Sequence, residues 1–300
     1  MIIKILSWNI NGFRAAIKKG FWEKVDQIGA NIICLQETKS DSEIMLSEIV
    51  THPNYSMVFH SCSMKKGYSG VATLCRGSGL QTIGRNEHEL SSGEDIFGQG
   101  SELVSAISSS PIILANKQIG LGIEKFDVEG RIVVTKYKVV DSDLTFTILN
   151  GYFPQGGRGP ERIEYKIEFY NEVYRFADKL RKSGEKVIIC GDLNTTVGDI
   201  DLARPKENRK TTGCLLEERE ALDIFLKNGF VDSFRHFYPE LGGKYSYWDQ
   251  ITRARERNVG WRIDYFLVDE LLLPYLKKAY IMDEIMGSDH CPVAIDLEVG

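Results

Sequence analysis

The stretch "KVIICGDLN", residues 186–194, sets the interpretation of the whole chain. Its four consecutive apolar residues, 187–190, are typical of a strand that is buried on both faces. Gly191 lets the backbone turn sharply, and Asp192 and Asn194 follow directly. A carboxylate at the end of a buried strand, with an amide two residues on, can orient a water molecule and hold its proton. The alternative is that Asp192 caps a helix.

Length and composition indicate an ordinary soluble globular protein. The chain has 300 residues, 43% of them hydrophobic and 26% charged, which is enough for a sizeable core. No apolar run approaches the roughly 20 residues that span a bilayer, so we expect no membrane association. The net charge is −5, which argues against gripping nucleic acid by bulk electrostatics. Local basic patches and a cation site remain compatible with that charge.

The six cysteines are scattered, and none forms a CxxC pair. A zinc site of the usual spacing is therefore not expected. The N-terminal "MIIKILSWNI" lacks the basic region and the cleavage site of a signal peptide, so it is interpreted as a first strand. Reduced thiols and the absence of a leader or a basic extension predict a cytoplasmic protein, which we expect to be a monomer.

Short β-branched runs alternate with helical patterns, which predicts an α/β fold. Helices are expected over residues 14–29, 160–182 and 216–229. No Pro/Gly/Ser-rich linker and no repeat divides the chain, so residues 1–300 form a single predicted domain. Within it, the Gly- and Ser-rich, weakly periodic stretch 77–118 is interpreted as an insertion. Strands are expected over 2–8, 31–37, 69–75, 131–140, 144–153, 186–194, 261–268 and 292–299.

Polar residues recur where the predicted strands end. Asn9 and Asn11 follow the first strand, Glu37 the second, and Tyr152 lies at the end of another. Each has a simpler explanation when taken alone: an Asn-Gly turn, a strand end that reaches water, or a core tyrosine with a satisfied hydroxyl group. Together they are typical of a hydrolytic site supported by a sheet. Carboxylates with neighbouring oxygen donors suit Mg²⁺.

Near the C-terminus, two segments are expected to meet. "GWRIDYF" places Asp264 within an apolar strand, where burying a carboxylate costs several kcal/mol unless it has a partner. "GSDHCPV", residues 287–293, places Asp289 beside His290 in a tight turn. His290 is the natural partner for Asp264, which would fix its tautomer and favour its protonated form.

The segment 244–261, "KYSYWDQITRARERNVGW", interleaves aromatic and basic residues. Its arginines are suited to phosphates, while Tyr247 and Trp261 could form the wall of a pocket for a sugar or base. "RPKENRK" at 204–210 adds a second basic loop, and "GRG" places Arg158 in a loop where it could bind a phosphate. The alternative for both basic runs is a solvated loop.

Eight motifs, taken in order, resemble the exonuclease III / AP endonuclease family within the endonuclease/exonuclease/phosphatase superfold. The resemblance extends over the whole chain apart from roughly 77–118. It implies a four-layer α/β sandwich, in which two mixed β-sheets pack face to face with helices outside. The motifs are "SWNINGFRA", "CLQETK", "KKGYSGVA", "EGRIVV", "GYFPQGGRG", "GDLNTTVGDIDLARPKENRK", "RARERNVGWRIDYFLV" and "MGSDHCPV".

The same resemblance implies Mg²⁺-dependent hydrolysis of DNA on the 5′ side of an abasic site, with 3′→5′ exonuclease or 3′-phosphatase activity; Mn²⁺ can substitute. Its substrate would be double-stranded DNA with abasic sites or 3′ ends. By motif position the catalytic residues are Tyr152, Asp192, Asn194, Asp264, His290 and Asn9. The metal neighbourhood comprises Glu37, Asn11, Asp289, Asp192 and Asn194. The substrate contacts are Arg158, Gln155, Tyr247, Ile251, Trp261 and Ile263.

Within this assignment, two roles stay open for Asp192: activating the attacking water or protonating the leaving group. Position 11 carries Asn where some members of the family carry Asp, which removes one negative charge from the metal neighbourhood. Two other functions also remain. One is a phosphodiesterase or phosphatase of the superfold that acts on another substrate, RNA included. The other is a catalytically silent DNA-binding relative.

Overall fold

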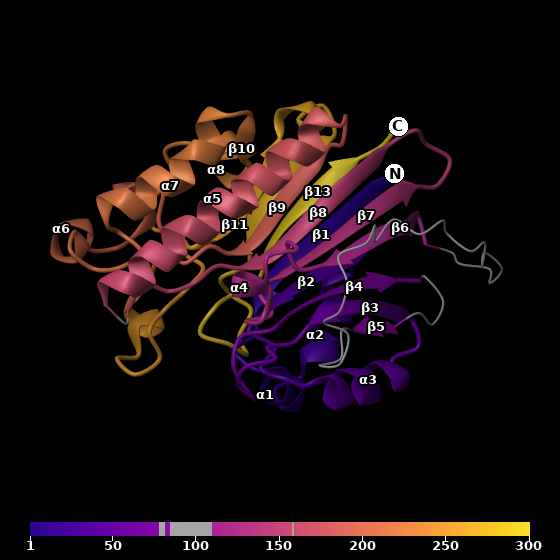
Figure 1. Ribbon diagram of the computed structural model, residues 1–300, viewed down its shortest axis with the longest axis horizontal. Helices are drawn as coiled ribbons and strands as arrows, with labels where there is room; N and C mark the ends of the chain where they lie inside the picture. The colour runs from indigo at the N-terminus through magenta and orange to yellow at the C-terminus, as the bar shows by residue number, and fades with distance from the viewer. Residues whose placement is uncertain (78–81, 85–109, 158) are drawn as a thin grey trace.

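The computed structural model describes residues 1–77, 82–84, 110–157 and 159–300. Two β-sheets stack face to face, and helices cover both outer surfaces (Figure 1). The first sheet has seven strands, in the order β12 (Leu276–Ile281), β13 (Val293–Glu298), β1 (Ile2–Asn9), β2 (Ile32–Gln36), β4 (Val71–Arg76), β3 (Tyr55–His60) and β5 (Thr82–Gly84).

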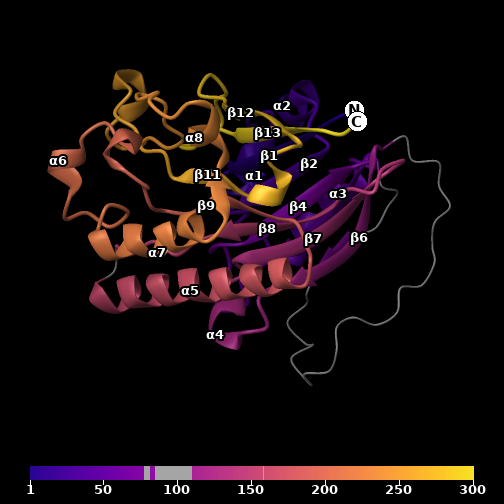
Figure 2. The ribbon, with the colours of Figure 1, turned by 90° about the horizontal axis from the view of Figure 1, so that it is seen from above.

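The second sheet has six strands, and both sheets are mixed. In the first sheet β1 pairs with β2 in parallel, and in the second sheet the strands β8 and β9 are parallel. The first and last strands of the chain, β1 and β13, are antiparallel neighbours, so the two termini lie side by side (Figure 2). The second sheet runs β10 (Phe230–Asp232), β11 (Asp264–Asp269), β9 (Val187–Asp192), β8 (Thr145–Tyr152), β7 (Ile132–Val139) and β6 (Ile112–Ile119).

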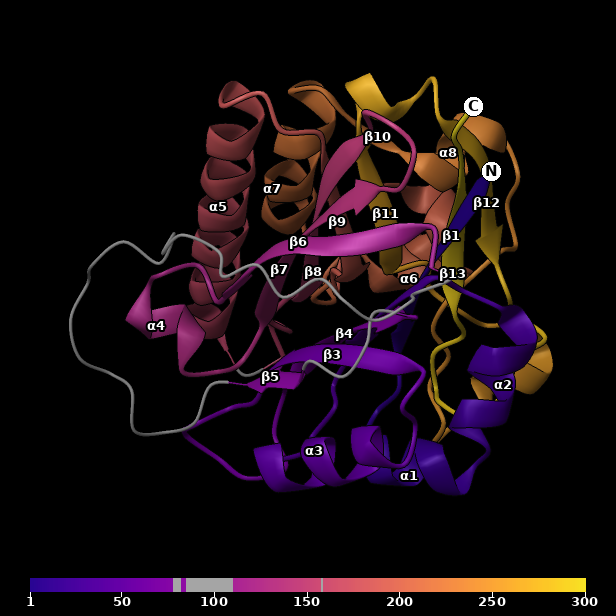
Figure 3. The same cartoon turned by 90° about the vertical axis from the view of Figure 1, so that its right-hand side faces the viewer.

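Figure 3 shows the four layers, with α5 and α7 on one side of the stacked sheets and α1, α2 and α3 on the other. The four-layer α/β sandwich predicted from the sequence is confirmed. None of the helices in the described residues combines the length and the apolar character needed to cross a bilayer. The helices are α1 (Phe13–Lys18), α2 (Phe21–Ile28), α3 (Ser42–Val50), α4 (Glu124–Asp127), α5 (Pro160–Lys182), α6 (Pro205–Asn208), α7 (Leu216–Lys227) and α8 (Ser233–Phe237).

Alternation along the strands sends side chains to three cores, one between the sheets and one under the helices on each outer face. On β1, Ile3 and Ile5 point into the gap between the sheets, whereas Leu6 and Trp8 pack against the first helices. On β9, Ile188 likewise faces the gap, while Ile189 packs under α5 and α7. Strands buried on both faces explain the continuous apolar runs of the sequence.

The structure corrects two of the segments predicted from the sequence, and it adds the strands β3, β10 and β12, which were not predicted. The helix expected over 14–29 is two helices, because Gly20, at φ 77°, lies in the left-handed region between α1 and α2. The last residues of the stretch 77–118 belong to β6, which pairs with β7 at the edge of the second sheet. The rest of that stretch, apart from Gly77, β5 and 110–111, lies outside the described residues.

Candidate active site

The inner faces of the strands change from apolar to polar in one direction. Along β1 the residues facing the gap are Ile3, Ile5, Ser7 and Asn9, all of them buried. The other strands repeat this order and end in Tyr152 on β8 and Asp192 on β9, while the antiparallel β11 begins with Asp264 opposite Asp192. The polar ends therefore gather at one edge of the two sheets. On β8 the inner-face order is Phe146, Ile148, Asn150, Tyr152, and on β9 it is Ile188, Cys190, Asp192.

Asn9 joins the two sheets at this edge. Its side-chain Nδ2 donates to Glu37 Oε1 at 2.9 Å and to Asp192 Oδ2 at 2.8 Å. Its Oδ1 accepts from the backbone N–H of Asn11 at 3.1 Å. Asn9 is fully buried, so its amide is fixed between one carboxylate from each sheet. This use of both amide atoms explains an asparagine at the end of a strand, where the residue is otherwise unfavourable.

Asp192 is buried, and its carboxylate accepts several hydrogen bonds. The backbone N–H of Asn194 donates to Oδ1 at 2.9 Å. The Asn194 side chain donates to Phe153 O at 3.0 Å and lies 3.3 Å from Asp192 Oδ2. Asn194 has φ 53°, so the chain turns back at once and brings its amide beside the carboxylate. Burial raises the pKa of Asp192 to about 7, opposed by the charge of His290.

Asp264 and His290 form the expected pair. His290 Nδ1 lies 2.8 Å from Asp264 Oδ2, and both residues are buried. The other ring nitrogen, Nε2, lies 3.8 Å from Asp192 Oδ2. Burial lowers the pKa of His290, but the charges of Asp264 and Asp192 outweigh burial and raise the pKa to about 10. His290 is therefore an imidazolium ion at neutral pH, which makes it a hydrogen-bond donor rather than a metal ligand.

A second set of oxygen atoms surrounds the ammonium group of Lys39. Its Nζ lies 2.7 Å from Glu37 Oε2 and 2.5 Å from Asn11 Oδ1. Asn11 Nδ2 donates in turn to Asp289 Oδ1 at 3.0 Å. The positively charged ammonium group occupies the position where these oxygens could hold a metal cation. The atoms that hold it are carboxylate and amide oxygens, which are the ligands of hard divalent ions.

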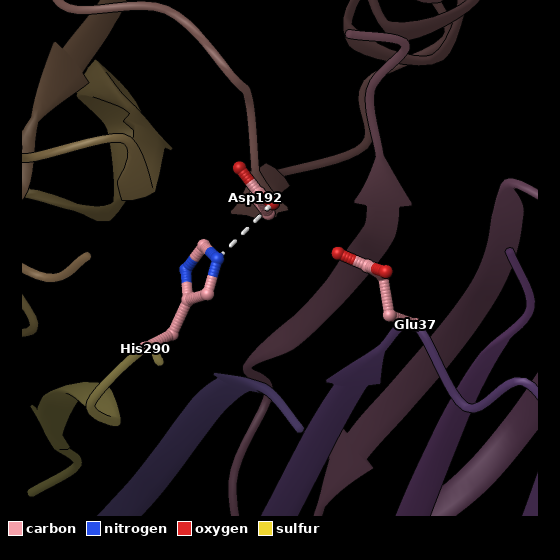
Figure 4. A group of neighbouring side chains, drawn as sticks. All are labelled: Glu37, Asp192 and His290. Carbon is pink, nitrogen blue, oxygen red and sulfur yellow. Dashed lines mark ion pairs between the residues drawn. The ribbon is translucent and has the colours of Figure 1, made fainter. Parts of the chain in front are cut away.

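The donor set therefore fits a metal ion. A carboxylate oxygen of Glu37, one of Asp192 and a ring nitrogen of His290 lie within 4.8 Å of one another. Figure 4 shows the three side chains turned toward a common space, with Glu37 from the first sheet and Asp192 from the second. Because His290 carries a proton on each nitrogen, the oxygen atoms of Glu37, Asp192, Asn11 and Asp289 are the better ligands.

Tyr152 is backed by a buried arginine. The Arg131 guanidinium lies 4.8 Å from the centroid of the Tyr152 ring and donates to its backbone carbonyl at 2.9 Å. Arg131 is itself held by Glu129 and by the hydroxyl group of Tyr68. Burial, together with the negative charges of Glu37 and Asp192, raises the pKa of Tyr152 well above its ordinary value. Tyr152 is therefore a neutral phenol with a proton to donate.

The residues predicted to contact substrate are distributed unevenly. The ring of Tyr247 lies against that of His290, with ring centroids 4.8 Å apart. The backbone of Tyr247 forms isolated antiparallel β-bridges with Trp261 and with His290. Ile263 is buried, only 5% exposed, next to Asp264. Ile251 is 94% exposed at the tip of a loop, and Gln155 is exposed as well. Arg158 lies outside the described residues.

Several residues at the site were not predicted. Lys39 lies in the motif "CLQETK", two residues after Glu37, and that spacing is the signal that could have identified it. Arg131 and Glu129 lie in "EGRIVV", where charged residues directly precede a buried strand. Gln36 and Asn150, one layer below the site, have no sequence signal beyond being polar residues in apolar strands.

Carboxylates, amides, a phenol and an imidazolium ion gathered where two sheets end define a hydrolytic site for an anionic ester. The chain belongs to the Endonuclease/Exonuclease/phosphatase family, whose sequence pattern matches residues 6–290. The resemblance to the exonuclease III / AP endonuclease group, made from the motifs, is confirmed by the relatives.

The chain is 37% identical to the exodeoxyribonuclease of Bacillus subtilis (strain 168), over 99% of this chain and 100% of the relative. It is 34% identical to the DNA repair nuclease APEX1 of Danio rerio, over 99% of this chain and 83% of the relative. Among solved structures, the catalytic domain of APE2 from Xenopus laevis superposes with a TM-score of 0.79 at 29% identity, covering 99% of this chain and 94% of that one. The family and the fold therefore agree along the whole chain.

Proposed function

We propose that the chain is a metal-dependent DNA-repair nuclease that hydrolyses the phosphodiester bond 5′ to an abasic site. A 3′→5′ exonuclease or 3′-phosphatase activity at the same site is part of the proposal. The observation that carries it is Asn9, which donates a hydrogen bond to one carboxylate from each sheet. The chain around it matches an exodeoxyribonuclease and a DNA repair nuclease over 99% of its length. Such a site can act on a phosphate ester only if it neutralises charge, orients water and assists the leaving oxygen.

Charge neutralisation falls to the oxygen cluster around Lys39. Glu37, Asn11 and Asp289 would hold Mg²⁺, or Mn²⁺ in its place, with Asp192 and Asn194 at the border of the same space. The bound ion would supply electrostatic stabilisation of the phosphate oxygens. Asn11 is neutral, so Glu37 and Asp289 carry the negative charge that attracts the cation. Lys39 Nζ contacts Glu37 Oε2 and Asn11 Oδ1, so these two oxygens would be free to hold a metal ion only with the Lys39 side chain turned away.

Proton transfer is assigned to Asp192 and Asn194. The backbone and side-chain N–H groups of Asn194 hold the Asp192 carboxylate in one orientation. A water molecule in line with the phosphate could give its proton to Asp192 while the Asn194 amide orients it. In the alternative, Asp192 donates a proton to the leaving 3′ oxygen. Both roles use the same carboxylate at the same place.

The developing charge on the phosphate is assigned to two donors, His290 and Tyr152. His290 is held by Asp264 through Nδ1, and its Nε2 lies 3.8 Å from Asp192 Oδ2. The Tyr152 phenol is neutral and has a proton to donate. Both N–H groups of Asn9 are used by Glu37 and Asp192, so Asn9 is assigned the role of ordering these two carboxylates. Donors that are already in place cost no reorganisation when charge develops, which is the main source of electrostatic catalysis.

Recognition of double-stranded DNA is assigned to the groups around this centre. Tyr247 and Trp261, with Ile263 behind them, would line a pocket for a flipped-out abasic sugar. Ile251, almost fully exposed, would lie against the duplex, and Gln155 and Arg158 would contact phosphates. We also propose a cytoplasmic monomer, which suits the six free cysteines.

Incision of a duplex carrying one abasic analogue tests the proposal, in Mg²⁺ and in EDTA. Wild type should cut on the 5′ side only with the metal. Glu37→Gln should lower kcat by about 10³-fold at unchanged thermal stability, because it removes the charge that attracts the ion. Glu43→Gln, an exposed carboxylate on α3, is the matched control and should cut like wild type.

The other functions give different results in the same experiment. A phosphodiesterase with another substrate would cut RNA or an undamaged strand without stimulation by the abasic site. A silent relative would bind the duplex and show no metal-dependent turnover. Either outcome contradicts the proposed function.

A further inference from the structure

A layer of buried polar side chains lies directly beneath the active site, between the two sheets. Ser7, Gln36 and Asn150 are all 0% exposed, and the next layer down is apolar. Gln36 Nε2 donates to Asn150 Oδ1 at 2.8 Å and to Ser7 Oγ at 3.0 Å. Gln36 lies on β2 of the first sheet, and Asn150 lies on β8 of the second. Their hydrogen bond therefore joins the two sheets.

Asn150 also reaches a second strand of the opposite sheet. Its Nδ2 donates to the Ala72 carbonyl at 2.8 Å and to Thr73 Oγ1 at 3.1 Å, both on β4. The single Asn150 side chain is thus bonded to β2 and β4 at once. Hydrogen bonds are directional and lose strength when donor and acceptor move apart, so this set fixes where β8 lies across the first sheet.

The apolar remainder of the gap cannot supply that restraint. The free energy gained by burying aliphatic side chains is roughly proportional to the buried area and does not depend on direction. Burying the amides is unfavourable unless they are bonded, and Gln36 Oε1 is buried without a partner among the described residues. Apolar side chains of similar size would therefore fill the layer at lower cost. The amides are better explained by what lies directly above them.

The active groups are divided between the two sheets. Glu37 directly follows Gln36, and Tyr152 comes two residues after Asn150 on the same face of β8. Asp192 is the register partner of Tyr152 on β9. A slip between the sheets would separate Glu37 from Asp192 and stretch the hydrogen bond from Asn9, on β1 of the first sheet, to Asp192 on β9 of the second. Misplacing a reacting group by about 1 Å can cost on the order of 10²-fold in rate.

We propose that Gln36 and Asn150 are positioning residues, which set the register of the two sheets so that the catalytic groups of both meet. The inference rests on the proposed function in one respect: the activity assay uses the abasic duplex as its substrate. Neither side chain touches the reacting atoms, so the effect on catalysis passes through Glu37, Tyr152 and Asp192.

The test replaces both amides with apolar side chains of similar length, in the double variant Gln36→Met/Asn150→Leu. We expect kcat on the abasic duplex to fall at least about 10-fold. The dissociation constant for the duplex, measured in EDTA, should change less than about threefold, and the melting temperature should stay within a few degrees of wild type. Ile148→Val, one layer deeper on β8, is the matched control and should lower the melting temperature without changing kcat.

A crystal structure of the double variant gives a readout that does not depend on activity. The distance from Asn9 Nδ2 to Asp192 Oδ2, 2.8 Å here, should lengthen beyond hydrogen-bonding range. If the variant does not fold, Thr73→Val removes the hydroxyl group on β4 that accepts a hydrogen bond from Asn150 across the two sheets, with little change in volume. It should lower kcat about threefold at an unchanged melting temperature.

Three results would overturn the inference: kcat within twofold of wild type, a loss of kcat matched by a loss of folded protein with Thr73→Val fully active, or an unchanged Asn9–Asp192 distance. Wild type that fails to cut the abasic duplex would contradict the proposed function instead. In that case the Asn9–Asp192 distance still decides the role of Gln36 and Asn150.

Discussion

The two ends of the gap between the sheets are built from the same strands, but one end is apolar and the other is polar and charged. At one end β9 places Ile188 in an apolar layer, and at the other it places Asp192 in the active site. The two positions are separated by roughly 13 Å at about 3.3 Å per residue. The apolar end excludes water and stabilises the fold. The polar end concentrates carboxylates and an imidazolium ion whose burial is unfavourable.

The residues that stabilise the fold and the residues that carry the chemistry therefore lie at different positions along the same strand. Side chains at the polar end are held by hydrogen bonds that cross between the sheets, such as the one from Asn9 to Asp192. These bonds are possible only because the apolar end already holds the sheets together. A substitution at one end should therefore change one property and leave the other intact.

The largest effect is expected for Asp192→Asn. The variant keeps the shape of the side chain and removes the group that exchanges a proton with water or with the leaving oxygen, so kcat on the abasic duplex should fall about 10³-fold. Thermal stability should stay equal or rise, because the variant no longer buries this charge. Incision rates and melting curves measured on one preparation check both statements. A less stable Asp192→Asn protein would show that the site also supports the fold.

The reciprocal change at the other end of β9 is Ile188→Ala. It leaves a cavity between the sheets and should lower the free energy of unfolding by about 2–5 kcal/mol. The rate per folded molecule should remain within about twofold of wild type. Urea unfolding and active-site titration separate the two quantities. A tenfold fall in the rate per folded molecule would mean that the two ends are not independent.

The same division explains what the sequence could predict. The apolar runs of β1, β2, β8 and β9 and the polar residues that end them were recognisable, because both signals lie within a few consecutive residues. The strand β12 was not recognised, since its "LKKAYI" places two lysines in a short, partly exposed edge strand. Tertiary pairing with β13, rather than a local pattern, makes it a strand.

The groups of the site were identified individually, but their contacts were not all predictable. Asp264 and His290 were paired in advance, because a buried carboxylate requires a partner. The bond between Gln36 and Asn150 joins residues 114 positions apart and depends on how two sheets lie across each other. The ammonium of Lys39 in the oxygen cluster likewise depends on the left-handed turn at Glu37, which has φ 50°.

The smallest effect is expected for Glu129, which lies beside the polar end of the gap. It tests whether a charged group outside the catalytic set contributes to stability. Its carboxylate accepts two hydrogen bonds from Arg162, both at 2.8 Å, and one from Arg131. Burial would raise its pKa, but the two guanidinium groups outweigh burial and lower the pKa below the ordinary 4.5. Glu129→Gln should lower the free energy of unfolding at pH 7 by about 2 kcal/mol.

The pH dependence of that deficit identifies its origin. Because the folded-state pKa of Glu129 is depressed, its contribution is fully present above about pH 4.5 and is lost as the pH falls through the folded-state pKa. The difference between wild type and Glu129→Gln should therefore close on acidification, whereas the exposed Glu124→Gln control should match wild type at neutral pH. Urea unfolding of both proteins from pH 7 to pH 3 measures this difference in the free energy of unfolding. A deficit that stays constant over this range would assign the loss to packing around Arg131, and Tyr152 would then depend on Glu129 for shape rather than charge.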